Sequence, residues 1–137
     1  MAGRATNQFD RRLTPGMQDT AMQTTLFILN DPPYGTERSY NALRLAVTLA
    51  LQPERQVRMF LIADAVFCAK SGQKTPTGYY NLEVMVTKVV QRGEIALCGT
   101  CMDARGLHDV ELVEGCRRST MVELAQWTAQ ADKVLVF

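Results

Sequence analysis

Short apolar runs that alternate with a helical stripe constrain the fold of this chain more than any other feature. Gln23–Asn30 contains four consecutive apolar residues, and Gln56–Ala63 is a second run of the same kind. Such runs predict strands that are covered on both faces, as in a parallel sheet. Between them, apolar residues recur with helical spacing from a predicted cap at Thr36 to a stop at Pro53. Strand, helix and strand in this order predict a parallel βαβ crossover.

The same alternation continues to the end of the chain. The further predicted elements are a helical turn at Ala65–Ala69 in the loop Asp64–Tyr79, a helix at Asn81–Gln91, a strand at Glu94–Cys98, a helix that begins at a capping box of Thr120 and Glu123, and a strand at Lys133–Phe137. Gly106–Gly115 is ambiguous, although Val110, Leu112 and Val113 favour a short strand there. We therefore predict a three-layer α/β/α sandwich with a mostly parallel sheet of four or five strands.

Length and composition predict one domain and exclude several classes of function. The chain has 137 residues, of which 47% are hydrophobic, so residues 22–137 can bury one core, while residues 1–21 read as a disordered tail or an extension. A net charge of +1 does not favour nucleic acid or an anionic membrane as a partner. The apolar runs are too short to span a membrane, and the first residues lack the apolar segment of a secretory signal, so we expect a cytoplasmic protein.

A pair of cysteines carries the strongest chemical signal. Cys98 and Cys101 form a C-G-T-C sequence in which Cys98 ends a predicted strand. Backbone N–H groups in the turn beyond a strand stabilise a thiolate and lower its pKa, and Arg105 can help while Asp103 would oppose it. A thiolate there is a nucleophile toward disulfides, persulfides and electrophilic carbon. Cys98, Cys101 and Arg105 are the predicted catalytic residues.

Other interpretations of these residues stay open. The C-x-x-C spacing also permits a disulfide, and Cys68 and Cys116 can complete a four-cysteine zinc site. Free cysteines are often simply buried, which is the favoured interpretation for Cys68 and Cys116. His108 is a polar loop residue or a general base. Neither a metal nor a cofactor is predicted from the sequence.

A small-anion site is a further prediction for the same region. Gly99, Thr100 and the pair Arg105-Gly106 lie in turns that present N–H groups, so this corner either binds an anion or merely exposes an arginine. Loops that follow parallel strands meet at one edge of the sheet, where ligands usually bind. Tyr34 and Cys68 lie in two such loops, and we therefore include them among the candidate ligand-binding residues.

Three segments resemble the DsrE/DsrF-like family and, within it, the small YchN-like proteins: Leu29–Ala46, Leu97–Gly106 and Ser119–Phe137. The resemblance implies an α/β/α sandwich and a homo-oligomer, either a trimer or a hexamer. In the sulfur-relay members, a cysteine that precedes an Arg-Gly pair by the spacing of Cys98 to Arg105 accepts sulfane sulfur as a persulfide. Cys98 is the acceptor by this resemblance. Cys101 departs from the relay pattern. Its presence argues against simple relay, because a neighbouring thiol can resolve a persulfide, release sulfide and leave a disulfide.

Two hypotheses about function follow. The first is a cytoplasmic sulfur-trafficking protein, sulfurtransferase-like in its chemistry, in which Cys98 is the acceptor, Cys101 is a resolving thiol, and other proteins donate and receive the sulfur. The alternative is a non-catalytic oligomeric module in which an inter-subunit cleft, lined by Tyr34, Cys68 and the cysteine stretch, binds a small anion or a partner protein. In the alternative the cysteines are structural or bind a metal.

Overall fold

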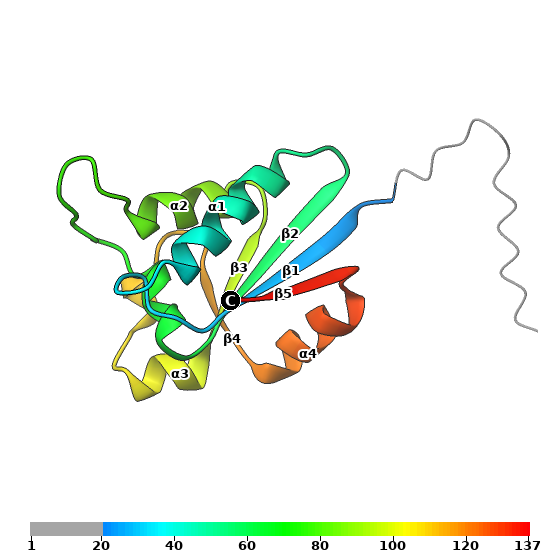
Figure 1. Cartoon of the computed structure of the whole chain (residues 1–137). Coiled ribbons are helices and arrows are strands. Elements are labelled where there is room, and N and C mark those ends of the chain that lie inside the picture. Colours follow the sequence, from blue (N-terminus) through cyan, green and yellow to red (C-terminus); the bar gives the residue numbers. More distant parts are fainter. Residues whose placement is uncertain (1–20) are drawn as a thin grey trace, which may run out of the picture.

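The protein is built around one parallel sheet, described here from a computed structural model of residues 21–137 (Figure 1). The strands are β1 (Gln23–Leu29), β2 (Arg55–Leu61), β3 (Glu94–Cys98), β4 (Arg117–Ser119) and β5 (Lys133–Val136). Their order in the sheet is β4-β3-β2-β1-β5, and every neighbouring pair is parallel. The predicted parallel sheet is confirmed, with five strands.

Helices cover both faces of this sheet, which confirms the predicted three layers (Figure 1). The helices are α1 (Arg38–Ala50), α2 (Leu82–Val90), α3 (Gly99–Ala104) and α4 (Met121–Gln130), with 3-10 helices η1 (Ala63–Ala69) and η2 (Asp109–Glu111). Helices α1 and α2 lie on one face and α4 on the other. Alternate strand residues point to opposite faces, so Phe27 and Leu97 join the core under α1 and α2, while Leu26 and Phe60 pack with Trp127 of α4.

The fourth strand is where the sequence-based prediction is wrong. The segment with Val110 and Leu112 forms η2 and a single antiparallel bridge between Lys70 and Leu112, whereas β4 lies further on, at Arg117–Ser119. Strand β4 is a three-residue edge strand with two exposed arginines. An edge strand pairs on one side only and needs no apolar run, so its sequence carries no period-two signal.

The helix starts agree with the prediction at two of three places. Asn81 caps α2 and Thr120 caps α4, where the Thr120 hydroxyl accepts a hydrogen bond from the Glu123 N–H at 3.4 Å. Helix α1 instead begins after Glu37, because the Thr36 hydroxyl donates to Asp31 Oδ2 at 2.9 Å. The predicted cap at Thr36 is therefore wrong by one residue, a shift that leaves the βαβ order unchanged.

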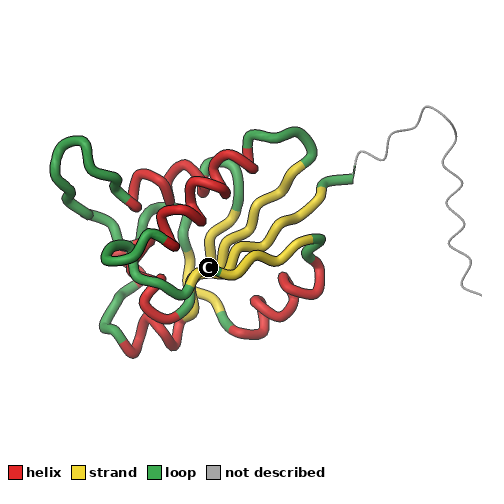
Figure 2. The backbone as a smooth tube through the Cα atoms, viewed as in Figure 1, coloured by secondary structure: helices red, strands yellow, loops and turns green. Residues whose placement is uncertain are grey.

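All five strands run in the same direction, so their carboxyl ends lie along one edge of the sheet. Figure 2 shows the loops that follow β1 and β2 grouped beyond this edge. Cys98 ends β3 there and pairs in register with Ser119, the last residue of β4. In the part of the chain that the structure describes, no helix is long and apolar enough to cross a membrane. The predicted tail lies outside the described residues except for Ala21.

Candidate functional site

Cys98 lies at the junction of β3 and α3, with its side chain on the α4 face of the sheet. The preceding residues Ile95–Leu97 are fully buried apolar strand residues, and Cys98 itself is only 6% exposed. Gly99 then permits a close approach to β4, because a Cβ there would lie 3.2 Å from the Ser119 carbonyl oxygen and 2.9 Å from Arg118 Nη1. The apolar strand and the glycine together place the sulfur at the rim of the sheet.

Hydrogen bonds surround the Cys98 sulfur. The Thr100 hydroxyl oxygen lies 3.1 Å from Cys98 Sγ, and the Cys101 N–H donates to the same sulfur at 3.4 Å. Burial by itself raises the pKa of Cys98, but the hydroxyl of Thr100, the thiol of Cys101 and the backbone N–H groups of both residues outweigh it. The net result is a Cys98 pKa below its ordinary value, because these donors stabilise the thiolate.

Cys101 sits in the first turn of α3 and behaves in the opposite way. Burial and the hydrogen bond with Cys98 raise the pKa of Cys101, although the Ala63 N–H, which donates to its Sγ at 3.3 Å, works against this rise. Ala63 adopts a left-handed backbone with φ of 50°, which is uncommon for a residue with a side chain. This conformation aims the Ala63 N–H at the Cys101 sulfur. The pKa values of the two neighbouring thiols are therefore shifted in opposite directions, with that of Cys98 lowered and that of Cys101 raised.

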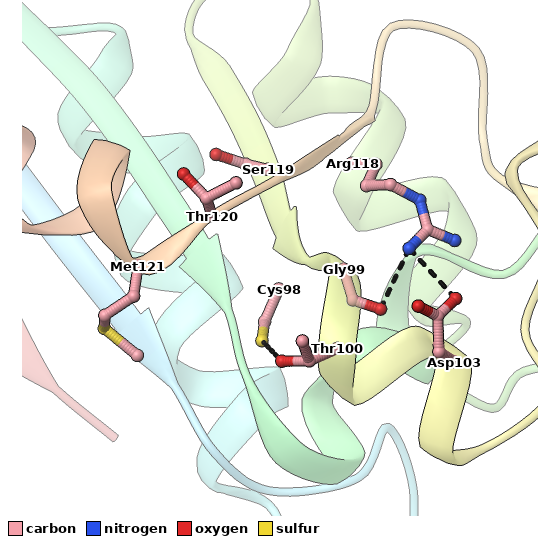
Figure 3. Close-up of a pocket in the computed structure, with 8 residues that line it drawn as sticks. All are labelled: Cys98, Gly99, Thr100, Asp103, Arg118, Ser119, Thr120 and Met121. Atoms are coloured by element: carbon pink, nitrogen blue, oxygen red, sulfur yellow. Dashed lines mark hydrogen bonds and ion pairs between the residues drawn. The ribbon is translucent and has the colours of Figure 1, made fainter.

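A pocket of about 490 Å³ opens beside Cys98 (Figure 3). Its lining residues come from the end of β3, the start of α3, β4 and the start of α4, and they are Cys98, Gly99, Thr100, Asp103, Arg118, Ser119, Thr120 and Met121. The pocket is therefore built where β3 and β4 end side by side, at the carboxyl edge of the sheet, which is the usual place for a ligand in a parallel α/β protein.

Arg118 ties the wall of this pocket together. Its guanidinium donates to the Gly99 carbonyl oxygen at 3.0 Å, and it forms ion pairs of 3.0 Å with Asp103 and 2.9 Å with Asp109. Figure 3 shows the guanidinium turned toward Gly99 and Asp103 and away from the Cys98 sulfur. These contacts join β4 to α3 and to η2, and they engage the Nε and Nη1 atoms of the guanidinium.

The predicted site residues fall into three groups. Cys98, Gly99 and Thr100 line the pocket together. Cys101 contacts Cys98 from α3, and Arg105 lies behind it, where the guanidinium donates to the Cys101 carbonyl oxygen at 3.2 Å and to Asp64 Oδ1 at 2.8 Å. Arg105 thus acts on Cys101, where its positive charge partly offsets the rise in pKa that burial causes. None of its contacts reaches Cys98.

The other predicted residues lie outside the pocket. Gly106 ends α3 with φ of 64°, which suits a glycine at a helix C-terminus. Tyr34 packs against Tyr80, and its hydroxyl donates to Gln73 Oε1 at 2.6 Å and accepts from the Leu82 N–H. These contacts fasten the loop before α2.

Two cysteines are structural by environment. Cys68 is fully buried in the core under α1 and α2, on the opposite face of the sheet from Cys98. Burial raises the pKa of Cys68 to about 12 and, acting alone, that of Cys116 to about 12. Among the described residues, no three His, Cys, Asp or Glu side chains are arranged to hold a metal ion, so the four cysteines do not form the zinc site considered above. His108 is exposed at the start of η2, where its backbone N–H donates to Glu111 Oε2 at 2.8 Å.

Sequence reasoning missed half of the pocket, namely Arg118, Ser119, Thr120 and Met121, and treated Asp103 only as a group opposing the thiolate. The one available signal was the capping box. Thr120 marks the start of a helix that follows a strand, and in a parallel sheet such a start lies at the carboxyl edge, beside Cys98. Because β4 was not predicted, the position of Thr120 beside Cys98 could not be inferred from the sequence.

Comparisons with known proteins agree with this fold. The model of the DsrE/DsrF-like family matches residues 23–137. Protein YchN of Escherichia coli strain K12 is 42% identical over 117 residues, which is 85% of this chain and 100% of the relative. An uncharacterized protein of Methanopyrus kandleri is 38% identical over 110 residues, covering 80% of this chain and 90% of that one.

Solved structures extend the comparison. The crystal structure of YchN from E. coli matches with a TM-score of 0.80, over 85% of this chain and 100% of that chain. A protein of unknown function from Methanobacterium thermoautotrophicum matches with a TM-score of 0.65 over 85% of this chain and 99% of its own, but at 12% identity it shares the fold alone. The family match across nearly all described residues, and the identity to YchN, lead to one conclusion: this chain belongs to the DsrE/DsrF-like family.

Proposed function

We propose that this protein is a cytoplasmic sulfur carrier in which Cys98 accepts sulfane sulfur as a persulfide. One observation carries the proposal: of the four cysteines, Cys98 alone has a pKa lowered below its ordinary value, and its sulfur lines a pocket. A thiolate is the reactive form of cysteine, so this combination of ionisation and access suits a sulfur acceptor. Family membership supports the same chemistry.

The acceptor step needs no external oxidant. The Cys98 thiolate attacks the outer sulfur of a donor persulfide R–S–SH, the new S–S bond forms on Cys98, and the donor's S–S bond breaks. The donor leaves as a thiolate, so the sulfane sulfur and its oxidation level pass to Cys98 together. The hydroxyl of Thr100 and the N–H of Cys101 hold the attacking sulfur as a thiolate before the step.

Cys101 is the resolving thiol in this proposal. Once deprotonated, its sulfur attacks the inner sulfur of the Cys98 persulfide, a Cys98–Cys101 disulfide forms, and hydrosulfide leaves. A dithiol reductant must then reduce the disulfide to restore the site. The hydrogen bond between the two side chains brings the sulfurs together, and the raised pKa of Cys101 lowers the fraction of its thiolate that is available for this step.

Assembly into a trimer or hexamer is part of the proposal. The α4 face of the sheet carries exposed apolar residues on β5 and at the start of α4, namely Val134, Val136, Met121 and Val122. Such residues are better covered than left in water when they lie next to one another. Light scattering coupled to size exclusion should give a mass of three or six chains, and a monomer at micromolar concentration would contradict this part.

The decisive test is direct detection of the persulfide. We expect the wild-type protein, incubated with a sulfurtransferase and its sulfur source, to gain one sulfur atom on the Cys98 peptide in mass spectrometry under non-reducing conditions. Cys98→Ser should gain none, and Cys101→Ser should accumulate more persulfide and release less sulfide. A wild-type protein that stays unmodified while a known acceptor protein is modified in the same tube sinks the proposal.

The size of the pocket favours a second candidate. A volume of about 490 Å³ is far larger than one sulfur atom needs, and it suits a bound molecule or a peptide side chain. In that case the protein is a non-catalytic binding module. Full cellular function of the double variant Cys98→Ser/Cys101→Ser would favour this candidate, and loss of function in Cys98→Ser alone would favour the carrier.

A further inference from the structure

The charges around the Cys98 pocket belong almost entirely to one cluster. Arg118 is the only basic residue and Asp103 the only carboxylate among the lining residues. Asp109 adds a second carboxylate to the same guanidinium at 2.9 Å. One positive and two negative charges leave this cluster, Asp103–Arg118–Asp109, with one net negative charge at neutral pH.

The pocket offers no other cation to a ligand. Arg105 is held by Asp64, and Arg117 by Glu123, both through ion pairs of 2.8 Å or less. The remaining polar groups of the lining are the neutral hydroxyls of Thr100, Ser119 and Thr120. All three hydroxyls are already engaged. Thr100 contacts the Cys98 sulfur, Ser119 donates to Glu123, and Thr120 caps α4.

We infer that this pocket selects small organic persulfides that carry no net negative charge, and that Asp103 sets this selectivity by occupying Arg118. The inference rests on the proposed role of Cys98 as sulfur acceptor. A carboxylate or sulfonate on a donor needs a positive partner when it leaves water, and here the guanidinium is already shared by two carboxylates and a carbonyl oxygen. A neutral or cationic donor meets no such penalty, and a cation is attracted by the net negative cluster.

The pocket's form agrees with a small donor. Its volume accommodates a short organic chain that ends in a persulfide, with the sulfur at Cys98 and the chain along Gly99 and Met121. Thiosulfate and persulfides with several carboxylates are therefore poor donors, whereas an aminothiol persulfide is a good one.

Charged methanethiosulfonate reagents measure this selectivity without any persulfide. A trimethylammonium-ethyl reagent and a sulfonato-ethyl reagent each form a mixed disulfide with a thiolate and release a sulfinate. We would measure both rates on Cys98 by peptide mass spectrometry and divide their ratio by the same ratio for free 2-mercaptoethanol. At low ionic strength the normalised preference for the cationic reagent should be about fivefold and should shrink as salt is added. A normalised ratio of one or less overturns the inference.

Substitutions within the cluster should move the ratio in opposite directions. Asp103→Asn removes a carboxylate and frees Arg118, so the normalised ratio should fall to about one or below, and Asp109→Asn should lower it less. Arg118→Gln should raise it. Glu114→Gln removes an acid that does not line the pocket and should leave it unchanged. Asp103 is 68% exposed, so its replacement by the isosteric amide should preserve the fold. A ratio that is insensitive to Asp103→Asn contradicts the assignment.

A second arm separates this inference from the proposed function. Cysteamine persulfide and glutathione persulfide would be compared as donors to Cys98, with transfer of one sulfur read by mass. Faster transfer from cysteamine persulfide, reversed in Asp103→Asn, supports the inference, and faster transfer from glutathione persulfide overturns it. If neither donor modifies Cys98 while the methanethiosulfonate ratio holds, the sulfur-carrier function fails and the charge selectivity stands for another ligand.

Discussion

Cys98 and Cys68 are almost equally hidden from solvent, yet their chemistry differs. Cys98 is 6% exposed and Cys68 is 0% exposed. Burial raises the pKa of Cys68 to about 12 and outweighs a hydrogen bond with the Ser39 side chain, which lowers it. The Cys68 thiol also donates to the Asp31 carbonyl oxygen at 3.8 Å, a bond that the thiolate would lose. Cys98 receives hydrogen bonds from Thr100 and from the Cys101 N–H, and its pKa falls. The balance between burial and the hydrogen bonds to the sulfur therefore decides the direction of each pKa shift, and this balance favours the thiol at Cys68 and the thiolate at Cys98.

The same comparison holds between the two faces of the sheet. On the α1 and α2 face, close packing surrounds Cys68 with apolar side chains. On the α4 face, β3 and β4 end side by side and leave a pocket next to Cys98. Both faces bury apolar side chains, but the pocket lies at the carboxyl edge on the α4 side.

The largest expected effect is the difference in alkylation rate. Near neutral pH the thiolate fraction of Cys98 should exceed that of Cys68 by about a thousandfold or more, given a pKa near 12 for Cys68 and one below the ordinary value for Cys98. Iodoacetamide in limiting amount, followed by peptide mass spectrometry, should label Cys98 first and leave Cys68 unlabelled in the native protein. Labelling of Cys68 at a comparable rate without denaturant would show that the two cysteines do not differ in thiolate fraction.

The next effect is the pH dependence of stability, which has opposite signs for the two cysteines. Cys68 has a folded pKa above its unfolded value, so its contribution is fully present below about pH 8.5 and is lost as pH rises toward 12. Cys98 has a lowered folded pKa, so its contribution is present above the unfolded value and is lost as pH falls through the folded one.

Urea unfolding at two pH values tests these signs. Between about pH 8 and pH 10, wild type should lose about 1–2 kcal/mol more of its free energy of unfolding than Cys68→Ala does. The control is Cys98→Ala, which should lose at least as much as wild type over the same interval, because it lacks the opposing contribution. Identical slopes for all three proteins would show that the two cysteines do not differ in this way.

A smaller effect is expected at Thr100, whose hydroxyl lies 3.1 Å from Cys98 Sγ. Thr100→Val keeps the shape and removes the hydroxyl, so the pKa of Cys98 should rise, and its reactivity near neutral pH should fall about threefold to tenfold. The pH dependence of thiolate absorbance in the ultraviolet gives the pKa. Thr100→Ser should retain the lowered value, and a rise in Thr100→Ser as large as in Thr100→Val would assign the effect to packing.

The smallest effect should come from Ala63, which holds its N–H against Cys101 Sγ in a left-handed conformation. Ala63→Gly keeps the N–H and removes the steric cost of the side chain, but it adds freedom to the unfolded chain. We expect the free energy of unfolding to change by less than about 1 kcal/mol and the Cys101 reactivity to stay the same. A large loss of stability would show that the Ala63 side chain itself supports this turn.

Much of the fold could be predicted from the residues because burial on both faces leaves a plain signal. Strands β1, β2 and β3 are runs of apolar residues, and β5 follows a helix with a capped start, so each was placed closely. The C-x-x-C position at the end of β3 was also predictable, since an apolar strand stops at a glycine. Strand β4 was not, because three residues with two arginines look like a loop until β3 lies beside them.

The sequence alone determined where the chain is apolar, where it turns, and that Cys98 ends a strand. These properties depend on neighbours along the chain, and local patterns record them. Tertiary structure alone decided the rest. Strand β4 brought Arg118 and Ser119 to Cys98, and the course of the chain after β2 put Cys68 on the opposite face of the sheet. The tertiary structure also gave the two thiols of the C-x-x-C pair different pKa values. These values depend on donors from Thr100 and Ala63, whose directions arise only when the chain is folded.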